Sequence, residues 1–377
     1  MKDEINRIGL QMLRLCRSVL LERKLKPDYV DRIDTDKLFQ LCEYHCLTAL
    51  VCTALEYNGI IPDKKWSDAK AKAIRKNMLL DAERAQITGF LENTHIWYIP
   101  LKGSVLKDYY PNVGMRQMSD NDILFDETKR DSVNVLMEER GYYLKSGKND
   151  HCDEWVKEPV YNFEMHLNLF TPRQDDTGYF TDIKGRLVRV SPDGYEYRFT
   201  DEDFYIYMTA HAYKHYHGAG SGLRTLIDYY VFLDKKESSM NWEYISAEIS
   251  KLELSEFEQQ IRTTALSFFA QESELTAEGK KMILFMINSG TYGSLDNWID
   301  AQADRLKVNS KGQYLFRRLF PTMNWWHKEY PATKKYPIKI VPLFFYRIGR
   351  MVSVRRKQII KEINVILHRK KKIYGKE

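Results

Sequence analysis

Long hydrophobic runs are missing from this sequence of 377 residues. No apolar stretch approaches the roughly 20 residues that a membrane-spanning helix needs. The first residues, Met1-Lys2-Asp3-Glu4, include acidic side chains and are not followed by the apolar segment of a signal peptide. These absences predict a soluble protein in the cytoplasm rather than an integral membrane or secreted one.

Cysteine is scarce, and long Gly/Ser linkers and internal repeats are missing. The five cysteines are odd in number, and four of them fall within helical patterns, which argues against a disulfide framework and favours a reducing compartment. Without repeats or flexible linkers, a solenoid or a string of tethered modules is excluded, and we expect the regions to pack against one another. With 44% hydrophobic residues, a chain of this length can bury the cores of two or three units.

An excess of basic residues is confined to the C-terminal end. Residues 338–377 contain twelve Lys or Arg and two Glu, although the whole chain has a net charge of only +6. Apolar residues at helical spacing alternate with Arg355, Arg356, Lys357 and Lys361, and Arg369-Lys370-Lys371-Lys372 follow them. One interpretation is a helix that contacts anionic lipid or nucleic acid. The favoured interpretation is a packed helix with a solvated basic face.

Three regions differ in their pattern, and together they predict an α+β fold. Residues 1–95 and 201–377 show apolar residues at helical spacing, with a long helix at 66–91 and the basic tail at the end. Residues 96–200 contain short β-rich runs and a helix at 128–140 that ends at Gly141. The predicted strands are 97–101, 121–125, 142–145, 153–156 and 161–167. We therefore expect a small mixed sheet flanked by two helical regions.

Two aspartates precede an apolar run in Asp120-Asn121-Asp122-Ile123-Leu124. In an extended strand, side chains two residues apart point to one face, so both carboxylates can converge on one point. A third carboxylate fits this arrangement, because Phe163-Glu164-Met165-His166 alternates apolar and polar residues and places Glu164 and His166 on one face. Several oxygen ligands on adjoining strands suit two Mg²⁺ ions, with Mn²⁺ as the alternative.

The segment Leu101-Lys102-Gly103-Ser104 indicates a phosphate site near these acids. A strand that passes into a helix at Gly103 and Ser104 leaves backbone N–H groups and a hydroxyl that can hold phosphate. Lys102 can reach a phosphate, and an exposed lysine at the strand end is the competing interpretation. Arg116 can present its planar fork to phosphate oxygens, or it can form an ion pair with Asp120 or Glu164.

In this order, the motifs resemble those of the polymerase-β-like nucleotidyltransferases, and in particular a branch of uncharacterised bacterial nucleotidyltransferases. The matching segments are Leu101-Lys102-Gly103-Ser104, Tyr110-Pro111, Gly114-Met115-Arg116, Ser119-Asp120-Asn121-Asp122-Ile123-Leu124, Gly141-Tyr142 and Phe163-Glu164-Met165-His166. The resemblance implies a nucleotidyltransferase core at 96–200. It also implies that Gly103 and Ser104 lie beside the triphosphate, while Asp120, Asp122 and Glu164 bind metal. The interval between Ser104 and Asp120 is longer than in the usual pattern.

Residues of the C-terminal helical region are also similar to that branch, in His211-Ala212-Tyr213-Lys214-His215 and Leu223-Arg224-Thr225-Leu226-Ile227-Asp228. Two histidines four apart on a helix can bind zinc. However, no Glu follows His211, and the proposed acidic site prefers oxygen ligands, so we expect His211 or His215 to contact substrate or phosphate. Arg224 and Asp228 are expected to pair.

The sequence thus predicts a magnesium-dependent enzyme that binds an NTP such as ATP and transfers NMP to an acceptor, with release of pyrophosphate. Glu164 serves either as a metal ligand or as a general base. Two alternatives stay open: a noncatalytic nucleotide-binding protein, and a protein that binds nucleic acid or anionic membrane through its basic C-terminal helix. Neither the acceptor, the NTP nor the oligomeric state follows from the sequence.

Overall fold

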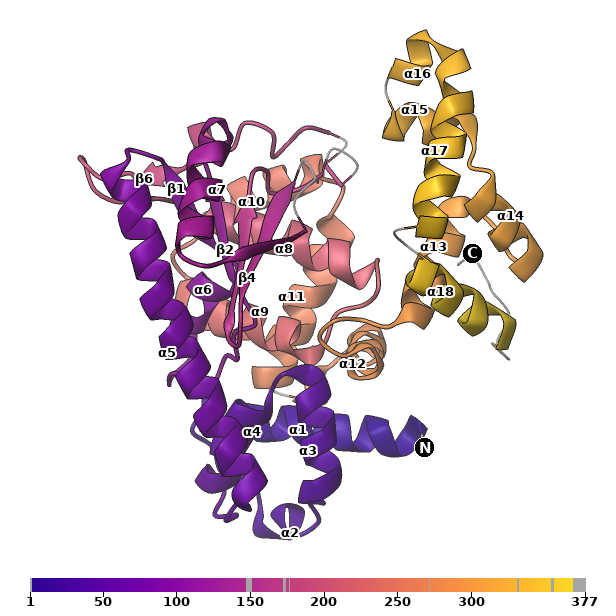
Figure 1. The fold of residues 1–377 in the computed structure, drawn as a ribbon. Helices are drawn as coiled ribbons and strands as arrows, with labels where there is room; N and C mark the ends of the chain where they lie inside the picture. The colour runs from indigo at the N-terminus through magenta and orange to yellow at the C-terminus, as the bar shows by residue number, and fades with distance from the viewer. Residues whose placement is uncertain are drawn as a thin grey trace. The chain divides into compact units, whose positions relative to one another are not determined.

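The computed structural model describes residues 2–146, 151–171, 174–175, 177–270, 272–330, 332–353 and 356–368. Its contacts divide the chain into two units (Figure 1). The first unit comprises Met1–Tyr213 and Gly222–Thr291, and the second comprises Lys214–Ser221 and Tyr292–Glu377. Within the described residues, no helix is long and apolar enough to cross a membrane.

The first unit begins with a group of helices that leads to a five-stranded sheet. The helices are α1 (Lys2–Leu20), α2 (Pro27–Val30), α3 (Thr35–His45), α4 (Thr48–Tyr57) and α5 (Lys64–Asn93). Asp63 caps α5, because its side chain accepts a hydrogen bond from the backbone N–H of Lys65. This long helix runs from the N-terminal helices to the sheet, as Figure 1 shows, and it contains the helix predicted at 66–91.

The central sheet has the strand order β1-β2-β5-β4-β3. Its strands are β1 (Tyr98–Leu101), β2 (Asn121–Phe125), β3 (Tyr143–Ser146), β4 (Cys152–Lys157) and β5 (Tyr161–His166). Strands β2 and β5 are parallel, and the other neighbouring pairs are antiparallel, so the sheet is mixed. The predicted α+β class is therefore confirmed, and all five predicted strands are present within one or two residues of their expected ends.

The connections around this sheet are short helices and a second small sheet. They are α6 (Gly103–Leu106), η1 (Lys107–Tyr109), η2 (Glu127–Lys129), α7 (Arg130–Glu139), η3 (Lys184–Arg186), β6 (Val188–Arg189) and β7 (Tyr197–Arg198). Helix α7 ends before Gly141, whose positive φ of 79° suits glycine, as predicted. The pairing of β6 with β7 was not predicted, because two residues are too few to give a periodic pattern.

Helices complete the first unit after the sheet. They are α8 (Asp201–Tyr216), α9 (Leu223–Lys236), α10 (Trp242–Lys251), α11 (Ser255–Ala270), η4 (Glu272–Glu274) and α12 (Ala277–Ser289). Thr200 caps α8 by accepting a hydrogen bond from the N–H of Asp203 at 3.1 Å, as the sequence Thr200-Asp201-Glu202-Asp203 predicts. The last residues of α8 group with the second unit.

The second unit is helical and has its own small core. Its elements are α13 (Leu295–Leu306), α14 (Lys311–Leu319), α15 (Met323–Glu329), α16 (Ala332–Lys335), η5 (Pro337–Lys339), α17 (Ile340–Ser353) and α18 (Arg356–His368). Ile366 of α18 is buried with Ile299 and Tyr314, whereas Ile360 and Leu367 are exposed. Of the predicted basic tail, Arg355 and residues 369–377 lie outside the described residues.

Candidate active site

The two faces of the central sheet differ in chemistry. Side chains alternate along each strand, so Ile123 of β2 and Met165 of β5 point to one face, where they join the apolar core with Ile87 and Val133 from the covering helices. The intervening residues point to the other face. In the parallel register of β2 and β5, Asp122 lies beside Glu164. The alternation in the sequence thus produces a polar face at the centre of the sheet.

Lys102 lies between these two carboxylates. Its ammonium nitrogen is 2.6 Å from Oδ1 of Asp122 and 3.5 Å from Oε2 of Glu164. Burial disfavours the ammonium ion, but the two carboxylates outweigh burial and raise the pKa of Lys102 above its ordinary value. The lysine predicted to reach phosphate therefore holds the carboxylates together in this state.

The backbone of Lys102 is strained. Its φ is +49° and its ψ is −115°, a combination that residues with a side chain rarely adopt. The strain occurs where β1 ends and α6 begins, and it directs the lysine side chain back over the sheet. Strain of this kind typically costs about 1–3 kcal/mol and is found most often at functional sites.

His166 completes the cluster beside Asp122 and Glu164. Its Nε2 atom lies 2.9 Å from Oδ1 of Asp122 and 3.4 Å from Oε2 of Glu164, and the residue is only 1% exposed. One ligand atom from each of these three residues lies within 4.8 Å of the others, so the three can hold a metal ion. The sequence placed His166 on the face of Glu164, and in the structure its ring also contacts Asp122.

Asp120 lies just before β2, outside that close group of three. Burial, together with the negative charges of Asp122 and Glu164, raises the pKa of Asp120 to about 7. Burial also opposes the charge of Asp122, but Lys102 and His166 overcome it and lower the pKa of Asp122 below its ordinary value. Asp122 therefore stays ionised, whereas Asp120 holds its proton more tightly than an exposed carboxyl group does.

The donor set fits a hard divalent cation. The carboxylates of Asp122 and Glu164 contact one ammonium ion, Asp120 interacts electrostatically with both, and carboxylate oxygens are the ligands that Mg²⁺ and Mn²⁺ prefer. Burial and the neighbouring carboxylates raise the pKa of Asp120, and an added cation would favour its ionised form. Asp120, Asp122 and Glu164 therefore suit the predicted metal.

Gly103 and Ser104 open the short helix α6, as predicted. A Cβ atom at residue 103 would collide with Nη1 of Arg116 and with the sulfur of Met118, so this close approach requires glycine. The Ser104 hydroxyl is buried and donates a hydrogen bond of 2.7 Å to the carbonyl of Leu101. In this state it stabilises the turn, and its predicted contact with phosphate stays a prediction.

Arg116 is buried and supports the same turn. Its Nε and Nη2 atoms donate to the two carboxylate oxygens of Asp228, at 2.8 and 3.0 Å, and Tyr110 donates to the same carboxylate at 2.8 Å. Asp228 was expected to pair with Arg224, but Arg224 donates instead to the carbonyl of Gln117 at 3.0 Å. The predicted contact of Arg116 with phosphate remains a prediction.

The two predicted histidines of α8 differ in their surroundings. His211 is half-buried, and its ring centroid lies 6.0 Å from that of Tyr207 in the first unit. His215 is exposed and belongs to Lys214–Ser221, which groups with the second unit. Their predicted contacts with substrate or phosphate stay predictions.

Tyr207 of α8 is a candidate that the sequence did not reveal. Its side chain is 2% exposed, and its hydroxyl has no hydrogen-bond partner within the described part of the chain. The charges of Lys102, Asp122 and Glu164 influence the pKa of this hydroxyl. In the sequence, Phe204-Tyr205-Ile206-Tyr207 resembles any buried helical stretch, and only the packing of α8 over the polar face distinguishes Tyr207 from its neighbours.

A comparison with known protein families agrees with this geometry. Residues 31–270 match the model of a family described as uncharacterised nucleotidyltransferase, which covers both the acidic cluster and α8. The chain belongs to this uncharacterised nucleotidyltransferase family. Membership supports nucleotidyl transfer as its general activity, and it confirms the resemblance that the motifs indicated. No curated protein and no solved structure matches the chain.

Proposed function

We propose that this nucleotidyltransferase family member transfers NMP from an NTP to a hydroxyl group of its acceptor and releases pyrophosphate. The observation that carries the proposal is the meeting of Asp122 and Glu164 at Lys102 on one face of the sheet, with Asp120 close enough to interact electrostatically with all three. This arrangement leaves an excess of negative charge that a divalent cation can neutralise. It coincides with the region that matches the family.

In this proposal, Asp120, Asp122 and Glu164 hold the Mg²⁺ ions, with Mn²⁺ as the alternative. When bound, these ions would supply Lewis-acid stabilisation of the negative charge on the triphosphate. His166 orients Asp122 through its hydrogen bond of 2.9 Å. The strained turn at Lys102 presents the ammonium group on the same side, where it can move from the carboxylates to a phosphate oxygen.

The reaction itself replaces a phosphoanhydride bond of the NTP with a phosphate ester bond to the acceptor. The oxygen of the acceptor hydroxyl forms a bond to the α-phosphorus, the bond from this phosphorus to the bridging oxygen of pyrophosphate breaks, and the hydroxyl proton passes to a base. Glu164 is the candidate base in the alternative in which Asp120 and Asp122 alone hold the metal, because its side chain remains 30% exposed while Asp122 is enclosed. Catalysis then consists mainly of placement and charge neutralisation.

A matched pair of glutamates tests this assignment. Glu154 of β4 lies directly across from Glu164 of β5, so the two carboxylates share one face of the sheet, but Glu154 forms an ion pair with Lys145. We expect Glu164→Gln to reduce Mg²⁺-dependent pyrophosphate release at least about 100-fold, and Glu154→Gln to change it less than about threefold. The assay monitors each of the four NTPs with water, sugars, nucleosides and RNA 3′ ends as acceptors.

The same experiment separates the enzyme from a noncatalytic binding protein. Thermal stabilisation by Mg²⁺ and NTP without release of pyrophosphate would favour the binding protein. The absence of both stabilisation and turnover would refute a nucleotide site at this face. Binding of anionic membrane or nucleic acid through the basic C-terminal helix remains a separate prediction, which salt-dependent binding would test.

A further inference from the structure

The two ring nitrogens of His166 have very different surroundings. Nε2 points to Oδ1 of Asp122 at 2.9 Å, and because a carboxylate only accepts hydrogen bonds, Nε2 carries the proton. In the neutral ring, Nδ1 then carries a lone pair. This atom is buried and has no hydrogen-bond partner among the described residues. A buried nitrogen without a partner destabilises the folded protein unless a ligand occupies it.

Two further side chains of types that commonly bind metals, a cysteine and a histidine, lie at this end of the sheet. Cys152, the first residue of β4, is the direct cross-strand neighbour of His166, so their side chains share a face. The ring of His151 is 5.1 Å from the ring of His166, and the carbonyl of His151 accepts hydrogen bonds from the N–H groups of Leu167 and Asn168. These bonds fix His151 beside the end of β5.

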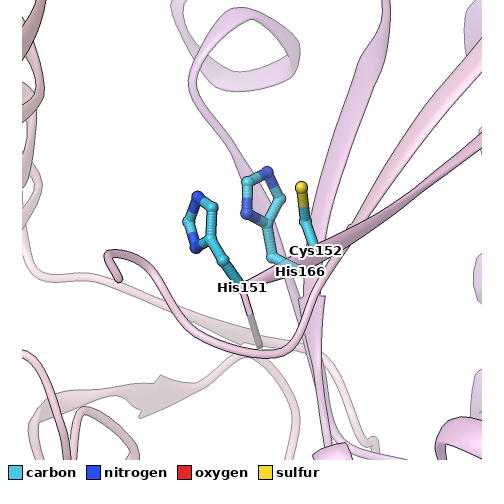
Figure 2. A group of neighbouring side chains, drawn as sticks. All are labelled: His151, Cys152 and His166. Carbon is cyan, nitrogen blue, oxygen red and sulfur yellow. The ribbon is translucent and has the colours of Figure 1, made fainter. Parts of the chain in front are cut away.

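The three side chains form one group. Figure 2 shows His166 between His151 and Cys152, and one ligand atom from each lies within 4.8 Å of the others. Two imidazoles and a thiolate form a ligand set that zinc and related transition metals prefer over Mg²⁺. A metal-bound histidine commonly donates its other N–H to a carboxylate, and His166 already makes such a bond to Asp122.

We propose that His151, Cys152 and His166 form a transition-metal site of the zinc class, with a fourth position open to water or another ligand. On binding, the metal accepts the lone pair of Nδ1 of His166 and a lone pair of His151. The thiol of Cys152 loses its proton to solvent and binds as a thiolate. This site goes beyond the proposed function and does not depend on it. It is connected to the carboxylate cluster because His166 takes part in both.

Cobalt binding to the full-length protein tests the proposal. The chain is first freed of transition metals with a chelator and then titrated with Co²⁺ in the presence of excess Mg²⁺, which favours the oxygen ligands of the carboxylate cluster. We expect one Co²⁺ per chain to produce a thiolate-to-cobalt charge-transfer band in the near ultraviolet. Addition of Zn²⁺ should remove this band by displacing cobalt.

Variants assign the band to its ligands. Cys152→Ser should abolish the band, and His151→Asn should weaken Co²⁺ binding at least about tenfold. Cys46→Ser is the matched control, since Cys46 is also a half-buried free cysteine but lies at the end of α3. It should leave the band unchanged. Circular dichroism verifies that each variant is folded. Because His151 is only partly buried, His151→Asn still tests the site if Cys152→Ser unfolds.

Three outcomes would overturn the proposal: the absence of a charge-transfer band at one equivalent of Co²⁺, a band that persists in Cys152→Ser, or a band lost in Cys46→Ser. Glu164→Gln distinguishes this test from that of the proposed function. The Glu164 variant should lose pyrophosphate release but keep the cobalt band, because Glu164 is not a ligand of the second site.

Discussion

Replacement of Asp120 by asparagine should stabilise the metal-free protein and at the same time remove its activity. The carboxyl group of Asp120 is half-buried near Asp122 and Glu164, and its pKa is raised from 3.8 to about 7. The folded protein therefore binds this proton more tightly than the unfolded chain does. Asparagine is nearly the same size and has no charge, so it removes the repulsion and retains the packing.

The expected magnitude follows from the pKa difference. One pKa unit corresponds to about 1.4 kcal/mol, so the raised pKa of Asp120 corresponds to a destabilisation of at most about 4 kcal/mol. Because the side chain is partly exposed, screening by water reduces this to about 2 kcal/mol. For a raised carboxyl pKa, the destabilisation develops as pH increases from about 4 to about 7 and stays constant above that.

Thermal or urea denaturation of both proteins in EDTA measures this effect. Asp120→Asn should be more stable than the native protein by about 2 kcal/mol at pH 7.5, or roughly 3–5 °C in Tm, and by much less at pH 4.5. Mg²⁺ should raise the Tm of the native protein and have less effect on the variant. Asp108→Asn is the control, since the Asp108 side chain is 71% exposed. It should show no such pH dependence.

The reasoning would be refuted if Asp120→Asn were less stable than the native protein at pH 7.5, or if the stability difference were the same at both pH values. Either result would mean that burial and the negative charges of Asp122 and Glu164 do not raise the pKa of Asp120 in the folded protein. A variant that is more stable but inactive is the signature of a residue kept for function at the expense of stability.

Two further variants test the surroundings of the carboxylates. Lys102→Met removes the ammonium ion that contacts Asp122 and Glu164, so Mg²⁺ should bind at least threefold more tightly in a thermal-shift titration. Lys107 is a similarly buried lysine, and Lys107→Met should not change Mg²⁺ binding. Weaker Mg²⁺ binding by Lys102→Met would contradict this expectation. Tyr207→Phe should leave Tm within about 1 °C and lower kcat/KM for the NTP about tenfold. Tyr205→Phe is the control and should lower Tm, because the Tyr205 hydroxyl donates a hydrogen bond to Glu258 at 2.6 Å. A large fall in the Tm of Tyr207→Phe would show that its hydroxyl has a structural role.

Much of the fold could be predicted because it depends on local patterns. The alternation around Asp122 and Glu164 gives the facing of both strands, and the structure places the two residues in direct register. The glycine at residue 141 and the cap at residue 200 mark helix ends by their own backbone chemistry. Such features depend on a few neighbouring residues, so sequence alone is enough to recognise them.

The partners of charged groups could not be predicted in the same way. Asp228 was assigned to Arg224, four residues away, but its partner is Arg116, which is 112 residues distant in the sequence. Helical spacing shows that two residues can meet, but it does not show which distant side chain competes for the same carboxylate. Tyr207 was missed for a similar reason, since only tertiary packing brings α8 over the polar face.

The structure separates supporting groups from groups that await a ligand by how well each is satisfied. Arg116 and Asp228 are buried, and both carboxylate oxygens of Asp228 are hydrogen-bonded, as expected of a scaffold. By contrast, Lys102 has a strained backbone, and the carboxyl group of Asp120 is repelled by its neighbours. The Tyr207 hydroxyl lacks a hydrogen-bond partner within the described chain. Each of these features destabilises the protein without a ligand. Their concentration on one face supports the proposal that this face, rather than the ion pair of Arg116 and Asp228, binds the nucleotide and metal.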